Sequence, residues 1–270
     1  MQAKSRVLII AGSDSSGGAG IQADIKTITA LGSYAMTAVT AVTAQDTKGV
    51  KKITPISTKN VQKQITMVLD DIGSDAVKIG MLHNSSIVKC VYSILKKYKL
   101  KNIVLDPVMV AKGGAKLINN SSIVYLKKLL LPLSNIITPN IPEAEILTGY
   151  SISSKEDMIK AAKKILSMGS KNVLLKGGHL KNKMIFDILA SKKGIRIFSK
   201  KKIKTKNTHG TGCTLSSALA TCLSQKKNVL KSCKISLKYV DRAIVSAPGY
   251  GKGFGPLNHL VSFNLRNIDA

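Results

Sequence analysis

The 270-residue sequence lacks any apolar run near the roughly 20 residues that a membrane-spanning helix needs. The apolar cluster LLLPL at 129–133 is short and contains a proline. The N-terminal segment MQAKSRVLIIAG has too brief an apolar part for a signal peptide, and it continues directly into a glycine loop. Since 44% of the residues are hydrophobic and no segment points to a membrane, we expect a soluble, cytoplasmic, globular protein.

Cysteine is also scarce. The four cysteines form no C-x-x-C pair and have no histidine partners at zinc spacing; they are Cys90, Cys213, Cys222 and Cys233. This pattern argues against both a zinc site and a disulfide framework, so we expect free thiols.

Acidic and aromatic residues are few, and the formal net charge is +28. Clustered cations bind nucleic acids by releasing counterions from the phosphate backbone, so a nucleic-acid-binding protein with steeply salt-dependent affinity is one alternative. However, nearly all of the cations are scattered lysines, and an aromatic content of 4% leaves few platforms for base stacking. We therefore expect lysines on solvated faces and no specific nucleic-acid partner.

The sequence does contain apolar, β-branched runs that alternate with stretches of helical spacing. Strands are predicted at 6–12, 35–45, 76–81, 102–109, 134–140 and 172–178, with an edge hairpin at 184–191 and 194–200. Helices are predicted at 21–32, 61–72, 87–98, 143–149, 157–169, 211–225 and about 229–247. This alternation predicts a single α/β domain over residues 1–270, a three-layer α/β/α arrangement with a central, mostly parallel sheet.

Ligands bind at the carboxyl ends of the strands in such sheets, so polar residues should follow the strands. The sequence meets this expectation with Asp14, Gln45, Lys78, Met81, Asp106, Asn140, Glu143 and Lys176. The predicted site therefore draws on six strands.

A glycine-rich turn, NTHGTGC, opens the predicted helix at 211–225. The first backbone N–H groups of a helix lack internal partners, and the peptide dipoles add partial positive charge there. Phosphoryl transfer needs fixed donors of this kind where negative charge develops. We expect Gly210, Thr211, Gly212 and Cys213 to bind an anion, although a plain glycine turn before a core helix is the simpler alternative.

A second glycine loop, GSDSSGGAG at 12–20, superficially resembles a dinucleotide-binding fingerprint. Its spacing does not fit G-x-G-x-x-G, so a dinucleotide-dependent oxidoreductase is a distant alternative. Such a loop favours close approach of backbone groups to a flat substrate.

Asp106 and Glu143 follow neighbouring strands, and two carboxylates with water and substrate phosphate suit Mg²⁺. Taken singly, Asp106 could be a turn residue before Pro107 and Glu143 a first-turn helix acid. Lys176, before Gly177-Gly178, could reach a phosphate oxygen. His209, like His179, could equally hold loop backbone in place.

These motifs together resemble one known family. AGSDSSGGAGIQADIKT, AVTAQDT, KIGM, LDPVM, ITPNIPEAEIL, LLKGGHL and KNTHGTGCTLSSALA are similar, in order and across nearly the whole chain, to hydroxymethylpyrimidine/phosphomethylpyrimidine kinases of thiamine biosynthesis. The resemblance implies a ribokinase-like fold, ATP as phosphoryl donor, Mg²⁺, a small pyrimidine substrate and a homodimer. Pyridoxine or pyridoxal kinases share that fold and are the nearest alternative.

The resemblance also implies roles for individual residues. Gln45 would read the pyrimidine edge, since an amide both donates and accepts hydrogen bonds. Gly12, Met81 and Val108 would lie around the ring, and we count Asp24 among the substrate-binding residues. Asn140 and Glu143 would act through Mg²⁺, with Asp106 as a further ligand, while Lys176 would hold the donor phosphate.

Cys213 stands where most of the superfamily has an aspartate base. We expect the helix N-terminus to lower the pKa of its thiol, so that the thiolate accepts the proton of the substrate alcohol. Phosphorylation of the monophosphate, whose oxygen is already ionised, should not need this base. A small cysteine closing the turn is the structural alternative.

Overall fold

We describe the protein from a computed structural model, covering residues 3–109, 117–180 and 183–262. The strands are β1 (Arg6–Asp14), β2 (Tyr34–Gln45), β3 (Val50–Pro55), β4 (Ala76–Ile79), β5 (Ile103–Leu105), β6 (Ile136–Ile137), β7 (Asn172–Leu175), β8 (Met184–Ser191) and β9 (Gly194–Lys201). The α-helices are α1 (Gly20–Ala30), α2 (Thr58–Asp71), α3 (Ser85–Lys97), α4 (Asn120–Tyr125), α5 (Ile141–Thr148), α6 (Lys155–Ser167), α7 (Thr211–Ser224) and α8 (Val229–Val245). A π-helical turn, η1 (Leu126–Leu130), continues α4, and a 3₁₀ turn, η2 (His259–Ser262), follows α8.

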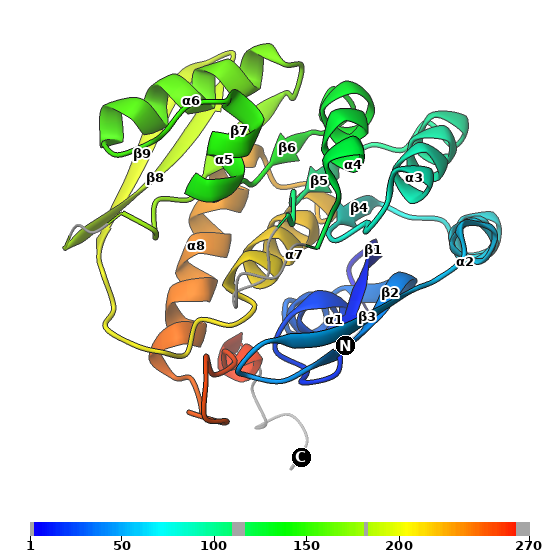
Figure 1. Cartoon of the computed structure of the whole chain (residues 1–270), viewed down its shortest axis with the longest axis horizontal. Helices are drawn as coiled ribbons and strands as arrows, with labels where there is room; N and C mark the ends of the chain where they lie inside the picture. Colours follow the sequence, from blue (N-terminus) through cyan, green and yellow to red (C-terminus); the bar gives the residue numbers. More distant parts are fainter. Residues whose placement is uncertain (1–2, 110–116, 181–182, 263–270) are drawn as a thin grey trace.

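The strands form one sheet in the order β3-β2-β1-β4-β5-β6-β7-β8-β9. The pairs from β2 through β1 to β7 are parallel, while β3 and the β8–β9 hairpin add antiparallel edges. The predicted α/β/α fold with a mostly parallel sheet is confirmed, and so is the edge hairpin (Figure 1).

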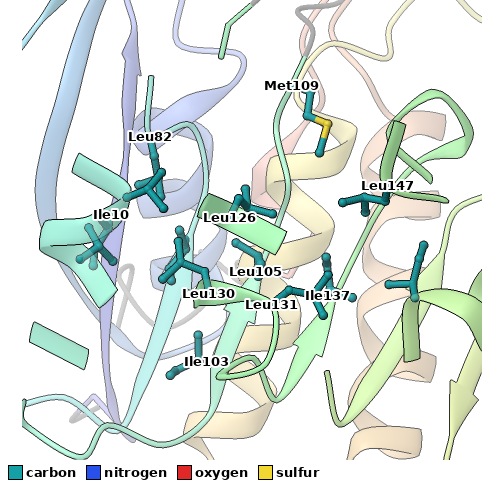
Figure 2. Close-up of a cluster of buried hydrophobic side chains, with 14 of the residues drawn as sticks. Ile10, Leu82, Ile103, Leu105, Met109, Leu126, Leu130, Leu131, Ile137 and Leu147 are labelled. Atoms are coloured by element: carbon teal, nitrogen blue, oxygen red, sulfur yellow. The ribbon is translucent and has the colours of Figure 1, made fainter. Parts of the chain in front are cut away.

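Each face of the sheet is covered by a different set of helices. Successive strand residues point to opposite faces, so Leu8 and Ile10 of β1 pack with α2, α3, η1, α5 and α6, whereas Val7 and Ile9 pack with α1, α7 and α8. Figure 2 shows part of the first cluster, where Leu105 of β5 and Ile137 of β6 lie close to Leu126 and Leu130 of η1. The central strands β1 and β4 to β7 are therefore buried on both sides, which explains their nearly continuous apolar sequences.

The structure differs from the sequence prediction in three places, and two of these differences have a clear physical cause. The sequence VKKITP, which forms β3, was not predicted as a strand because its lysines and proline do not show the alternation of a half-buried strand; β3 is an exposed edge, where such residues are tolerated. The short α4–η1 helix was also missed. The strands β5, β6 and β7 are shorter than predicted, since the chain leaves the sheet before Asp106, Asn140 and Lys176.

No helix in the described ranges is both long and apolar enough to span a bilayer.

A fully buried ion pair joins three elements under the sheet. The ammonium of Lys78 in β4 lies 2.7 Å from Oδ2 of Asp24 in α1, and neither side chain is exposed. Ser217 of α7 donates a hydrogen bond of 2.7 Å to the other carboxylate oxygen. The pair raises the pKa of Lys78 against the opposing effect of burial, so the ammonium stays charged inside the protein. These contacts fix α7 relative to the sheet.

We predict that Lys78→Met lowers the free energy of unfolding by about 3–5 kcal/mol, because Asp24 would remain buried without its cation. The double variant Asp24→Asn/Lys78→Met should recover much of this loss. Asp75→Asn is the control: it breaks the exposed Arg6–Asp75 pair and should cost no more than about 1 kcal/mol. Urea unfolding measures all three variants. Similar losses of unfolding free energy for Lys78→Met and Asp75→Asn would show that the buried pair matters no more than the exposed one.

Candidate active site

The start of α7 lies where the sequence analysis placed the anion-binding turn. Gly210 precedes the helix with a left-handed φ of +81°, and a Cβ atom there would lie 1.8 Å from the carbonyl oxygen of Gly18. Both constraints require glycine at this position. The glycine loop at 12–20 thus lies against the turn before α7, although Gly18 and Gly210 are 192 positions apart in the sequence.

The N-terminus of α7 has no side-chain cap. In the described part of the chain, every other α-helix except α1 is capped by an asparagine or serine side chain. The α1 helix begins at Gly20, beside the same site. Thus the two helices without side-chain caps are the two that begin there. At α7 the N–H of Thr211 bonds to the carbonyl of Thr208 at 3.4 Å, and the N–H groups of Gly212 and Cys213 follow it at the mouth of the helix, where a ligand could accept from them.

Lys176 and Asp106 lie against this helix start. The Lys176 ammonium is 3.2 Å from Oδ1 of Asp106. A Cβ atom on Gly212 would lie 3.2 Å from that ammonium and 3.5 Å from Oδ2 of Asp106. Thr138 and Ser216 donate hydrogen bonds to the carboxylate of Asp106. Although burial works to raise the pKa of Asp106, the lysines Lys176 and Lys78 hold it below its usual range.

Asn140 and Glu143 form a capping box at the start of α5. The Asn140 side chain accepts from the backbone N–H of Glu143, and the Glu143 carboxylate accepts from that of Asn140, both at 2.9 Å. Burial, the larger cause, and the nearby Asp106 raise the pKa of Glu143 to about 7, while Lys176 opposes them. Both residues thus have a structural role in addition to any role toward a ligand.

The expected lowering of the Cys213 pKa is wrong. Burial raises the pKa of the thiol to about 12, and the charge of Lys78 only partly opposes this, while Asp24 and Asp106 raise it further. The N-terminus of α7 is only one influence on the thiol, and the loss of hydration together with two carboxylates outweighs it. The sulfur also accepts a hydrogen bond from the backbone N–H of Gly20.

The predicted ring-binding residues lie together near the end of β2. Met81 and Val108 belong to one apolar cluster with Ala41 and Leu117. The sulfur of Met81 lies 3.1 Å from the position that a Cβ atom on Gly12 would occupy. This cluster supplies the apolar surface that a flat ring needs.

Gln45 ends β2, and its amide lies 3.2 Å from Nε2 of His209, the residue before Gly210. The amide is therefore within one residue of the start of α7. His209 itself is 6% exposed and contacts Asp14 at 2.8 Å. Nothing in the sequence connects Asp14 with His209, since their separation of 195 residues leaves no local signal.

The assignment of Asp24 to substrate binding is wrong as a direct contact. Its side chain has no exposed surface, and its two oxygens are bonded to Lys78 and Ser217.

Ser216 and Ser217 were missed as supporting residues. A signal existed, because hydroxyl side chains at adjacent positions of a fully buried helix must find partners.

In the described ranges, no three His, Cys, Asp or Glu side chains gather closely enough to hold a metal by themselves. The oxygen atoms of Asp106 and Glu143 nevertheless suit Mg²⁺, which is typically bound by one or two carboxylates together with water and substrate phosphates.

An uncapped helix start beside a lysine and two carboxylates, in a sheet of this order, defines a phosphotransferase of ribokinase-like fold. The phosphomethylpyrimidine kinase family model matches residues 14–258. The chain belongs to that family.

Individual relatives agree. A hydroxymethylpyrimidine/phosphomethylpyrimidine kinase of Bacillus subtilis is 44% identical over 255 residues, covering 94% of each chain. The thiamine biosynthesis bifunctional protein ThiED of Geobacter sulfurreducens is 46% identical over 95% of this chain, which spans 52% of that longer protein. Among solved structures, an ADP complex of Bacillus subtilis pyridoxal kinase aligns with a TM-score of 0.88 at 36% identity, over 94% of this chain and 97% of that one.

We predict that Gly210→Ala lowers kinase activity by about a hundredfold, because its Cβ forces the two glycine loops apart and misplaces the helix start. Gly149→Ala is a matched control. Gly149 has nearly the same φ, +83°, but nothing lies within 4 Å of its Cβ position.

Both variants carry backbone strain of about 1–3 kcal/mol, which urea unfolding measures. Only Gly210→Ala should lose activity in steady-state assays. Equal activity in the two variants would show that the loop contact is unimportant.

Proposed function

We propose that the protein phosphorylates 4-amino-5-hydroxymethyl-2-methylpyrimidine with ATP, and then phosphorylates the monophosphate to the diphosphate, in thiamine biosynthesis. One observation carries the proposal: the start of α7 adjoins Lys176 and Asp106 on one side and, through His209, the amide of Gln45 on the other. The names of the relatives support the same substrates. We also propose that residues 1–270 form one kinase domain that acts as a homodimer, as the sequence resemblance implies.

In this proposal the phosphoryl group passes at the mouth of α7. The backbone N–H groups of Gly212 and Cys213 would bind its oxygens, where the helix dipole adds to their effect. The ion pair with Asp106 holds the ammonium of Lys176 close to the helix start, where it would bind a phosphate oxygen of the donor. These groups are fixed before the ligand arrives, so little reorganisation opposes the transfer.

The acceptor would lie between Gln45 and the apolar cluster. Gly12 has no side chain, so the backbone of β1 can approach the face of a ring, with Met81 and Val108 beside it. Gln45 can donate to a ring nitrogen and accept from an exocyclic amino group. The hydroxymethyl group would then point toward α7.

We propose that Asp106 and Glu143, with Asn140, hold Mg²⁺ partly through water. The pair fits such an ion because Asp106 raises the pKa of the buried Glu143, so a cation would relieve their repulsion. The ion, when bound, would neutralise phosphate charge. We expect chelation with EDTA to abolish turnover.

A pyridoxal kinase is the second candidate. The 36% identity and TM-score of 0.88 to the Bacillus subtilis enzyme support it, since that fold accommodates another heteroaromatic alcohol. Its ADP complex also supports a nucleotide donor for this chain.

The test is product analysis by mass after incubation of the purified protein with Mg-ATP and each alcohol. We expect the pyrimidine to gain one and then two phosphates, with higher kcat/KM than pyridoxal. Turnover of pyridoxal alone would favour the second candidate, and turnover of neither would contradict both.

The raised pKa of Cys213 gives a prediction for its proposed role as base. If the thiolate accepts the alcohol proton, the rate of the first step should rise with pH from 7 to 10. The pKa of the thiol is about 12, so the fraction of thiolate is small in this range and increases with every step in pH. The second step uses a phosphate that is ionised above roughly pH 6, so its rate should be nearly independent of pH in this range.

Cys213→Ala should flatten the profile of the first step and spare the second. Cys213→Ser, which keeps the size of the side chain, serves as the control for packing. Parallel profiles for the two steps in the wild-type protein would leave Cys213 with a purely structural role.

A further inference from the structure

His209 is held rigidly between the two glycine loops. Its backbone N–H donates to the carbonyl of Gly255 at 3.1 Å. Its ring lies against Gly18, where a Cβ atom would approach Cδ2 to 2.4 Å. The Nε2 atom faces two groups, Oδ2 of Asp14 at 2.8 Å and the side-chain amide of Gln45 at 3.2 Å.

The Asp14 carboxylate decides where the proton of the His209 ring lies. Besides His209, it accepts hydrogen bonds from the backbone N–H groups of Ser16, Gly18 and Ala19. Burial works to raise the pKa of Asp14, but these bonds outweigh it and keep the pKa below its usual range. An ionised carboxylate is only an acceptor. Nε2 of His209 must therefore carry a hydrogen.

This hydrogen fixes the amide of Gln45. Nε2–H has one hydrogen and no lone pair, and the shorter contact to Asp14 takes most of that hydrogen. The amide oxygen of Gln45 can share it, whereas the amide nitrogen, itself a donor, would find no acceptor there. The structure places the amide nitrogen toward His209, and the amide oxygen lies 3.2 Å from Oγ1 of Thr43. Since the two ends of an amide have the same shape, their hydrogen-bond partners decide which end is which. The Thr43 hydroxyl donates to the carbonyl of Ser13 at 2.8 Å, so it is left to accept from the amide nitrogen. Both neighbours thus require the two ends to be exchanged, with the amide oxygen toward His209 and the amide nitrogen toward Thr43.

We propose that His209, held by Asp14, is a positioning residue that determines ring specificity by fixing the orientation of the Gln45 amide. The amide then presents one acceptor, on the His209 side, and one donor, on the Thr43 side, in a fixed order. An aminopyrimidine edge offers the complementary amino donor and ring-nitrogen acceptor. A 4-oxo pyrimidine reverses both groups and meets two mismatches. This inference rests on the proposed function, because it takes Gln45 as the reader of a pyrimidine.

The first test needs no substrate. Nitrogen-15 NMR of the full chain distinguishes protonated from unprotonated imidazole nitrogens, and His209→Gln identifies the His209 signals among the four histidines. We expect Nε2 of His209 to be protonated. An unprotonated Nε2, with the proton on Nδ1, would overturn the proposal whatever the enzyme phosphorylates.

The second test compares kcat/KM for the aminopyrimidine alcohol and its 4-oxo analogue. We expect the wild-type protein to prefer the amino compound by about a hundredfold or more. His209→Gln keeps an N–H donor the same number of bonds from the backbone, and should retain the preference within about threefold. His209→Phe removes the donor and should reduce the preference at least about tenfold, and His209→Phe/Thr43→Val should reduce it to a few-fold.

A merely structural role would lower both kcat/KM values together and leave their ratio unchanged, which would overturn the proposal. If the wild-type protein phosphorylates neither pyrimidine, the proposed function fails, and NMR still decides the state of His209.

Discussion

Two serine–aspartate–lysine units under the start of α7 hold the helix against the sheet, and the rest of the site depends on them. Ser217 donates to Asp24, which pairs with Lys78, and Ser216 donates to Asp106, which pairs with Lys176. The first unit is completely buried, whereas 14% of the Lys176 side chain is exposed. In the buried unit the charges satisfy one another, so removing either partner leaves an uncompensated charge. The lysine of the second unit is partly exposed, and it is the lysine that we propose binds a phosphate.

Much of the fold could be predicted from the sequence, because buried parallel strands and amphipathic helices leave strong periodic signals. The helix start at Gly210 was also predictable from glycine spacing alone. The properties that could not be predicted are those that depend on particular distant neighbours. Asp24 looks like a polar residue available to a ligand until Lys78 is brought to it from the next layer. The pKa of Cys213 follows from burial and from Asp24 and Asp106, none of which a helix-terminus argument includes.

The fold does not choose the substrate. A pyridoxal kinase shares this fold over nearly its whole length, so the choice of ring must come from side chains at the site. Gln45 is a flexible residue with an amide that can turn end for end, which alone would give poor discrimination. His209 and Thr43 remove this freedom, since one offers only a hydrogen and the other only a lone pair. Discrimination between rings is then a property of three side chains rather than one.

The loop at 14–20 links the two ends of the proposed site, the ring end at Gln45 and the phosphate end at α7. Ser15 bonds to both the backbone N–H and the carbonyl of Gln45, at 2.9 and 2.8 Å, so the loop holds the residue at the ring end. Gly18 packs against Gly210, and Gly20 donates to the sulfur of Cys213, so the same loop holds the phosphate end. The separation between Gln45 and the start of α7 is therefore set by one short, internally bonded segment. A substrate that bridges Gln45 and the start of α7 must match this separation, which is fixed before the substrate binds.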